Sequence, residues 1–331
     1  MKVAGFTIVR NALKFDYPAA EAIRSILPVC DAVYVAVGDS EDKTHELIQN
    51  IDNEKIVIIK TRWDMSLREG GKVLAVETNK AFDAIAPEYD WCFYIQADEV
   101  MHEKYVEPVK KAMQQFWSEP EVEGLLFKYR HFYGSYDYVG SSRRWYRREV
   151  RIVRNNKAIR SYKDAQGFRL AGRKLRVKLI DAEIYHYGWV KPPEKQQEKQ
   201  KHFNKFWHSD EKVKKMVGNA DAFDYSEIDV LEKFEGTHPR VMKPRISAKN
   251  WTFDYDISKA DMSLKDALLY QIEKHTGLRI GEYKNYKLIW NLTSNNITDP
   301  EKSKPFPCNC VFISTTFVFY LKWTWTERLL P

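Results

Sequence analysis

The chain has 331 residues, of which 44% are apolar and 14% aromatic, and its formal net charge is +7. This length permits one large domain or two small ones, and the apolar share is sufficient for a sizeable core. The four cysteines include no C-x-x-C pair, which favours a reducing compartment over a disulfide-based fold. The first residues lack the basic and apolar pattern of a signal peptide, so we expect a cytoplasmic protein.

Positive charge is concentrated between Ser141 and Lys178, where fourteen Lys and Arg residues stand against two acids, Glu149 and Asp164. We call residues 141–178 the basic block. Such a block predicts a negatively charged partner, which is a diphosphate, an acidic glycan or lipid headgroup, or a nucleic acid.

Strands and helices are predicted to alternate over the first hundred residues. The predicted strands are Val3–Val9, Ala32–Val37, Lys55–Lys60 and Trp91–Ile95, and the predicted helices are Tyr17–Leu27, Thr44–Ile51 and Gly71–Ile85. This order predicts an α/β fold with a mainly parallel sheet flanked by helices. Ligands of such sheets bind beyond the carboxyl ends of the strands, where the polar turns Gly38–Thr44 and Gln96–Glu99 occur.

The second half of the chain becomes helical and charged. Strands are predicted at Gly124–Tyr133 and Leu175–Ile184, and helices at Glu194–Lys215 and Leu264–His275. We therefore expect a catalytic domain over residues 1–190, a mostly helical extension over 191–290 that packs on it, and a poorly ordered tail over 291–331. An apolar run in that tail, Cys310–Leu321, is too short to cross a bilayer, although an interfacial anchor would place the protein at the inner face of the membrane.

The turn Gln96-Ala97-Asp98-Glu99 ends an apolar strand abruptly in two carboxylates. Hard divalent cations bind carboxylate and phosphate oxygens, so a carboxylate at a strand end is well placed to hold a cation beside a diphosphate. Taken alone, the same pattern equally describes a helix N-cap.

A second turn, Gly38-Asp39-Ser40-Glu41-Asp42-Lys43-Thr44, joins a strand to a helix and offers several polar side chains to a nucleoside. Here too, Asp42 or Ser40 serving only as the cap of the following helix is an equal alternative.

The ordered set of these pieces resembles the inverting family 2 glycosyltransferases of the GT-A fold. Their pattern is a strand, a Ser-x-Asp-x-Thr turn, a helix carrying Asn and a strand ending in Asp-x-Asp. The corresponding residues here are Phe6–Asn11, Ser40-Glu41-Asp42-Lys43-Thr44, Thr78-Asn79-Lys80-Ala81 and Gln96-Ala97-Asp98. The chain departs from the pattern at Val37-Gly38, where the family has acids that contact the base, and at Gln96, where it has the first Asp.

The resemblance implies a GT-A-type sheet and a nucleotide-diphosphate sugar as donor, with Mn²⁺ or Mg²⁺ as cofactor. Asp98 matches the family's metal ligand, and His186, in Tyr185-His186-Tyr187, matches a second ligand that the family often supplies. The residues expected to bind the nucleotide and its diphosphate are Arg10, Asn11, Asp39, Ser40, Asp42, Asn79, Gln96 and Arg151.

An inverting transfer also needs a base that takes the proton of the acceptor hydroxyl. Asp164 is the first candidate because it is the only carboxylate between Val150 and Lys178, and Glu149 is the second. A structural ion pair is the alternative role for both. The basic block and the resemblance together favour an acceptor in a surface polysaccharide or a lipid-linked glycan.

Two other functions compete with glycosyl transfer. A nucleic-acid- or polyanion-binding protein would use the basic block, but it has no need of carboxylates at a strand end, which repel phosphates unless a cation intervenes. A nucleotidyltransferase on a related fold usually has a glycine-rich loop after its first strand, whereas this chain has Arg10-Asn11-Ala12-Leu13. We therefore expect no nucleic-acid partner.

Overall fold

The computed structural model describes residues 1–51, 54–67, 69–218, 220–258 and 261–289. They belong to two compact units. The first comprises Met1–Ala260 and Tyr283–Trp290, and the second contains the helix α8 (Leu264–Thr276), capped by the Ser263 hydroxyl. The sequence expectations for residues 291–331 lie outside the described residues.

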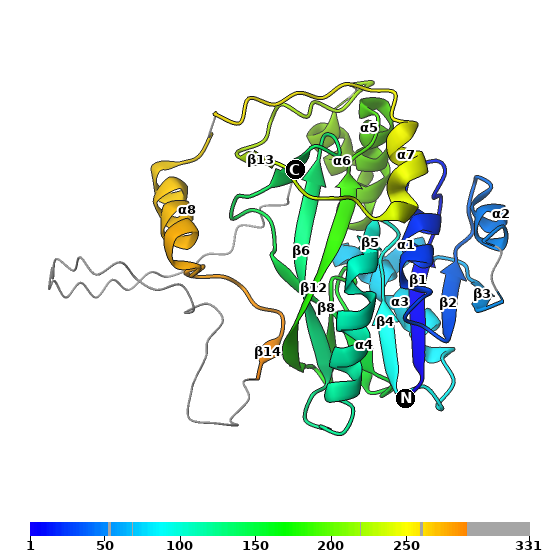
Figure 1. Ribbon diagram of the computed structural model, residues 1–331. Helices are drawn as coiled ribbons and strands as arrows, with labels where there is room; N and C mark the ends of the chain where they lie inside the picture. Colours follow the sequence, from blue (N-terminus) through cyan, green and yellow to red (C-terminus); the bar gives the residue numbers. More distant parts are fainter. Residues whose placement is uncertain (52–53, 68, 219, 259–260, 290–331) are drawn as a thin grey trace, which may run out of the picture. The chain divides into compact units, whose positions relative to one another are not determined.

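The first unit alternates strands and helices as predicted, and its large sheet is drawn in Figure 1. The strands are β1 (Val3–Val9), β2 (Ala32–Val37), β3 (Ile56–Lys60), β4 (Trp91–Tyr94), β5 (Glu99–Met101), β6 (Gly124–Tyr133), β7 (Tyr138–Gly140), β8 (Arg148–Arg154), β9 (Ile159–Tyr162), β10 (Gly167–Leu170), β11 (Arg173–Lys174), β12 (Arg176–Trp189), β13 (Leu231–Lys233) and β14 (Lys287–Leu288). The helices are α1 (Ala19–Ile26), α2 (Thr44–Gln49), α3 (Lys72–Asp83), α4 (Val106–Gln115), α5 (Pro193–Phe203), α6 (Asp210–Val217) and α7 (Lys243–Ser247).

The large sheet is mixed, with a parallel half built from the first part of the chain. Strands β3, β2, β1 and β4 lie side by side and run parallel. Strand β8 pairs antiparallel with both β4 and β6, while β12 runs parallel to β6 and antiparallel to β5. The expected fold class, an α/β fold with a GT-A-type mixed sheet flanked by helices, is confirmed.

Alternation along the central strands sends side chains to two cores, one on each face of the sheet. In β4, Trp91 and Phe93 join the cluster that contains α1 and α4, whereas Cys92 and Tyr94 join the cluster that contains α3. Figure 1 shows α1 and α4 on one face of the sheet and α3 on the other. Covering both faces explains why strands such as β2 and β4 are apolar at every position.

Most of the elements that the sequence predicted begin and end within one or two residues of the expectation, but two differ from it, and α4 and several short strands were not predicted. Strand β12 continues to Trp189, beyond the predicted end at Ile184, because it pairs with β6 along most of its length. The predicted helix Glu194–Lys215 is two helices, since α6 begins anew where the Ser209 hydroxyl accepts a hydrogen bond from the Lys212 amide. Among the described residues, no helix is long and apolar enough to cross a membrane.

Candidate functional site

The loops after β1 and β2 are joined by side-chain hydrogen bonds at the carboxyl edge of the sheet. The backbone amide of Asn11 donates to the Ser40 hydroxyl over 3.1 Å, and the backbone amide of Glu41 donates to the Asn11 side-chain oxygen over 2.8 Å. Asp42 accepts from the backbone amides of Lys14 at 2.6 Å and Thr44 at 3.0 Å. Asn11 is fully buried with a φ of 53°, and its side-chain nitrogen has no partner. The two loops therefore form one unit with an unused buried donor.

Arg10 and Asp39 lie at the exposed side of this unit. The Arg10 Nε donates to the Asp39 carbonyl over 2.9 Å, and its guanidinium lies 5.4 Å from the centre of the Trp63 ring. The Asp39 side chain is 45% exposed. Gly38 is packed so closely on Trp63 that an added Cβ would lie 2.4 Å from the indole nitrogen. Glycine is therefore required where the resemblance had suggested an acid.

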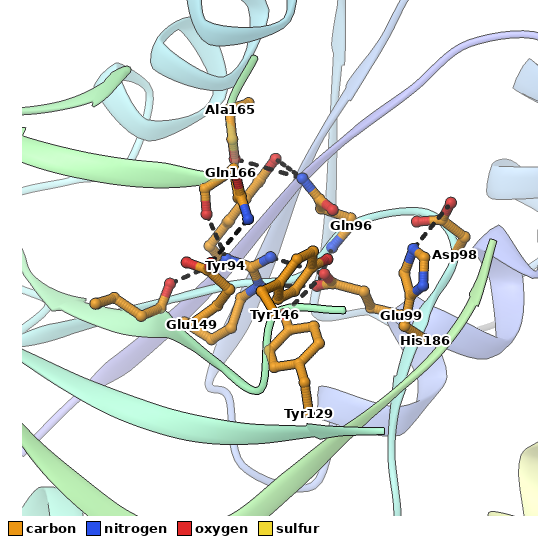
Figure 2. Close-up of polar contacts among 12 residues, drawn as sticks. Tyr94, Gln96, Asp98, Glu99, Tyr129, Tyr146, Glu149, Ala165, Gln166 and His186 are labelled. Carbon is orange, nitrogen blue, oxygen red and sulfur yellow. Dashed lines mark hydrogen bonds and ion pairs between the residues drawn. The ribbon is translucent and has the colours of Figure 1, made fainter. Parts of the chain in front are cut away.

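The strand end after β4 brings Asp98 against the last part of β12. The Nε2 atom of His186 lies 3.7 Å from Oδ2 of Asp98 (Figure 2). The Tyr187 amide donates to the Asp98 carbonyl over 2.7 Å, which holds the acidic turn on β12. At Gly188 a Cβ would lie 2.7 Å from both the Asp98 carboxylate and the His186 ring, so only glycine leaves room for the pair. The structure thus brings together the two residues predicted to bind a metal.

Hydrogen bonds of His131 orient the ring of His186. The Nε2 atom of His131 lies 2.7 Å from the Tyr146 carbonyl oxygen, which can only accept, so this nitrogen is the donor. The Nδ1 atoms of His131 and His186 lie 3.2 Å apart and share one hydrogen bond. This contact leaves Nε2 of His186 facing the Asp98 carboxylate.

Two buried lysines, Lys191 and Lys199, place positive charge near the Asp98–His186 pair. The ammonium of Lys199 lies 3.5 Å from Oδ2 of Asp98 and donates to the Gly188 carbonyl over 2.8 Å. The ammonium of Lys191 donates to the Phe15 carbonyl, and both lysines lie over the ring of Tyr17. Burial lowers the pKa of both lysines, well below the ordinary value for Lys191. Burial raises the pKa of Asp98, but His186 and the lysines outweigh this and leave it below its usual value.

The neighbouring acid Glu99 has an internal partner. Its carboxylate accepts two hydrogen bonds from Arg151, over 2.9 and 2.7 Å, and one from the Tyr129 hydroxyl over 2.7 Å (Figure 2). Both members of the ion pair are fully buried, and Arg151 also donates to the Gln166 carbonyl. The Arg151 guanidinium, which was expected to contact a diphosphate, thus points into the protein and holds Glu99 of the acidic turn in place.

Gln96 connects the acidic turn to the loop that carries Asp164. Its side-chain nitrogen lies 3.4 Å from both the Tyr94 hydroxyl and the Ala165 carbonyl. In that loop Lys163 and Ala165 have positive φ, and Asp164 is half-buried next to Gly71. Burial raises the pKa of Asp164. Asn79 stabilises the same loop from α3, since its side-chain oxygen accepts from the Ser161 amide over 2.8 Å.

Glu149 lies deeper in the protein than Asp164. It accepts hydrogen bonds from the side-chain amides of Gln166 at 2.9 Å and Asn285 at 2.8 Å. Burial raises the pKa of Glu149 to about 8, so this carboxyl is largely protonated at neutral pH. A protonated, enclosed carboxyl is unsuited to accept a proton from an acceptor hydroxyl.

The metal implied by the resemblance fits the Asp98–His186 pair. A carboxylate oxygen and an imidazole nitrogen that face each other over 3.7 Å are both metal-binding groups, and the Lys199 ammonium balances the carboxylate in this structure. Among the described residues, no three His, Cys, Asp or Glu side chains are clustered as a metal site. A divalent cation would therefore take two ligands from the protein and depend on substrate oxygens or water for the rest.

No family model matches the chain, and no curated protein matches it. Among solved structures it is similar to S. aureus TarS, with 15% identity, a TM-score of 0.33 and coverage of 61% of this chain and 39% of TarS. Residues 1–349 of TarS in complex with UDP show 14% identity and a TM-score of 0.33 over 66% of this chain and 70% of that one. Glucosyl-3-phosphoglycerate synthase from Mycobacterium tuberculosis, with Mn²⁺, UDP and phosphoglyceric acid, shows 14% identity and a TM-score of 0.27 over 39% and 43%. The chain thus spans well under half the length of full TarS.

Lys191, Lys199 and His131 were not among the residues that sequence reasoning selected. Lys199 lies in a helix so rich in charge that its lysines look like a solvated face. A signal was present nevertheless, because Lys199 shares a helical face with Gln196 and Phe203, which are three and four residues away. Gln196 is fully buried and neither polar atom of its side chain has a partner.

Proposed function

We propose that this protein is an inverting glycosyltransferase that moves a sugar from a nucleotide-diphosphate donor to an acceptor hydroxyl. The observation that carries the proposal is the Asp98–His186 pair, a carboxylate and an imidazole nitrogen 3.7 Å apart. It lies at the carboxyl edge of the parallel strands, next to the joined loops after β1 and β2. Ligands of open α/β sheets bind at this edge.

The nucleoside part of the donor is assigned to the loops after β1 and β2. The exposed carboxylate of Asp39 and the guanidinium of Arg10 would bond polar atoms of the base or ribose, with Trp63 beneath them. The unpartnered side-chain nitrogen of Asn11 supplies a further buried donor. Ser40 and Asp42 shape the loops through their own backbone contacts, which gives them an indirect part in binding.

The diphosphate is assigned to the corner formed by Asp98, His186 and Lys199. When bound there, a Mn²⁺ or Mg²⁺ ion neutralises charge that develops on the leaving diphosphate. Asp98 and His186 would hold the ion. The ammonium of Lys199 already lies 3.5 Å from the same carboxylate and would add a fixed positive charge. Because this corner is enclosed, each charge acts there more strongly than in water.

Asp164 is the residue that we assign as the base. Its loop is joined to the acidic turn by the contact of the Gln96 side chain with the Ala165 carbonyl, which supports a position near the donor. A raised pKa makes a carboxylate a better proton acceptor for the incoming hydroxyl. Attack by that hydroxyl opposite the leaving diphosphate inverts the configuration of the sugar carbon. A glycan or lipid-linked acceptor suits the positive charge of the basic block.

The proposal is tested with a panel of nucleotide sugars, in which release of the nucleoside diphosphate is measured with Mn²⁺ and with EDTA. We expect turnover with one donor in Mn²⁺ and its loss in EDTA, and the same loss in Asp98→Asn. Asp221→Asn removes an exposed carboxylate elsewhere and is the matched control. Full activity of Asp98→Asn, or of the wild type in EDTA, would contradict the metal site. Failure of every nucleoside diphosphate to bind would contradict glycosyl transfer itself.

A further inference from the structure

A second positively charged site lies away from the proposed active site, at the start of β12. An open hollow of about 650 Å³ is lined by Arg173, Lys174, Arg176, Tyr286 and Lys287. Strand β14 contributes Lys287 and pairs with the first residues of β12 (Figure 1). His186 is ten residues further along β12, so the hollow is roughly 30 Å from the metal pair at the rise of an extended strand.

One buried carboxylate holds the two arginines of this hollow in place. Glu123 is 5% exposed, and its two oxygens accept from Arg173 over 2.6 and 2.8 Å and from the Arg176 guanidinium over 3.1 and 3.2 Å. The Arg176 amide adds a further bond of 2.8 Å to the same carboxylate. Although burial opposes ionisation, the arginines lower the pKa of Glu123 to about 2, so it stays charged. The guanidinium planes are therefore oriented before any ligand arrives.

The lysines add positive charge that is not matched by this carboxylate. Lys174 donates to the Lys284 carbonyl, which carries no charge, over 2.6 Å. Four cationic side chains thus line the hollow, and the Glu123 carboxylate, which contacts two of them, carries one negative charge. Oriented guanidinium groups next to flexible ammonium groups are the combination that binds phosphate oxygens.

We propose that the hollow binds a phosphate-bearing polyanion through its phosphate groups. The aromatic residue in its lining, Tyr286, is only 6% exposed and offers no free face for a base to stack on. The neighbouring Tyr283 is 63% exposed, but it does not line the hollow, and the Lys174 ammonium lies 4.8 Å from its ring centre. Stacking on exposed aromatic rings is a main source of affinity for single-stranded nucleic acids. The lining of the hollow therefore offers groups that bind phosphates and no exposed ring for a base.

The site gives a role to three cations of the basic block, Arg173, Lys174 and Arg176, that the proposed active site does not use. Arg151 is buried with Glu99, Arg154 donates to backbone carbonyls, and Arg160 pairs with Asp83. Arg173, Lys174 and Arg176, by contrast, open onto a concave surface. This proposal does not depend on glycosyl transfer, and its test uses no donor sugar.

The test measures binding of a fluorescent short inorganic polyphosphate to the full chain in EDTA, across a range of salt concentrations. For Lys174→Gln and Lys287→Gln we expect the slope of log affinity against log salt to become less negative by about 0.7 each. That corresponds to about fivefold weaker binding at roughly 0.1 M salt. Lys60→Gln, on the edge strand β3 at the other end of the sheet, is the control with the same change of charge and should bind as the wild type.

Arg173→Gln is the second variant, and its fold is checked by thermal melting because it removes a partner of Glu123. Unchanged salt slopes in both lysine variants would overturn the proposal. Single-stranded DNA of equal charge is the comparison ligand. Equal affinity for the two ligands supports recognition of phosphate alone, whereas much tighter binding of DNA would overturn it in favour of a nucleic-acid site.

Discussion

The Nδ1 atoms of His131 and His186 lie 3.2 Å apart, and the Nε2 atom of His131 is bound to the Tyr146 carbonyl over 2.7 Å. Metal-binding histidines usually have such a second partner, which sets the tautomer and orients the ring. We expect His131→Phe to keep the packing of a flat ring but to release His186. The affinity of the variant for Mn²⁺, measured by electron paramagnetic resonance, should fall about 10- to 100-fold. The control is His275→Phe, which changes an exposed histidine in the second unit and should leave the Mn²⁺ affinity unchanged. Unaltered Mn²⁺ binding by His131→Phe would show that His186 needs no such partner.

Lys199 is expected to contribute to diphosphate binding independently of the metal. Lys199→Met keeps the length of the side chain and removes its charge, which costs one charge-assisted interaction. Such bonds contribute about 1.5–3 kcal/mol, so UDP should bind roughly 10- to 100-fold more weakly in EDTA, as measured by calorimetry. Lys201→Met, two residues along the same helix with its ammonium on the Ala220 carbonyl, is the control. Equal affinities of the Lys199→Met variant and the wild type would place Lys199 outside the diphosphate site.

One pair of variants distinguishes which of the two acids, Asp164 or Glu149, acts as the base. Asp164→Asn should lower kcat by about 10²- to 10⁴-fold, the usual contribution of a general base, with UDP affinity unchanged. Glu149→Gln replaces a largely protonated carboxyl by an amide of the same shape and should keep most of the turnover. A reversal of these two results would exchange the roles of the two acids. Loss of UDP affinity in Asp164→Asn would instead assign it a structural role.

Stability should depend on pH through Glu149. Its pKa is raised in the folded state to about 8 from an ordinary value of 4.5, so the folded protein holds a proton that the unfolded chain releases. This contribution is fully present below about pH 4.5 and is lost as the pH rises towards about 8. Glu149→Gln removes the titration. Melting temperatures at about pH 5 and about pH 9 should therefore differ less in the variant than in the wild type. An identical pH dependence in both proteins would show that Glu149 is ionised in the folded state.

The buried Glu99–Arg151 pair should be important for folding. Arg151→Met leaves the Glu99 carboxylate without its cation, and loss of one partner of a buried pair typically costs about 3–5 kcal/mol. Glu99→Gln/Arg151→Met removes both charges and should recover part of this loss. Urea denaturation measures both variants. If Arg151→Met were as stable as the wild type, the guanidinium would be available for the role in phosphate binding that the sequence had suggested.

The sequence alone determined the alternation of strands and helices and the edge of the sheet at which polar turns gather. Apolar runs such as Ala32–Val37 are visible locally, because a strand covered on both faces is apolar at every position. Turns such as Gln96–Glu99 are equally local. Asp98 and His186 were found because each follows a recognisable run, and the topology then placed them together.

Only the tertiary structure decided which charged side chains at this edge are paired inside the protein and which face the proposed ligand site. Asp98 and Glu99 are adjacent in the sequence, yet Asp98 faces His186 and Lys199 whereas Glu99 is paired with Arg151. Likewise, the sequence does not distinguish Lys199 from the other lysines of its helix. Its special position comes from the packing of α5 on β12, which places its ammonium next to Asp98. Burial and partners distant in the chain set which charged group is free to bind a ligand, and neither is encoded in any local stretch of residues.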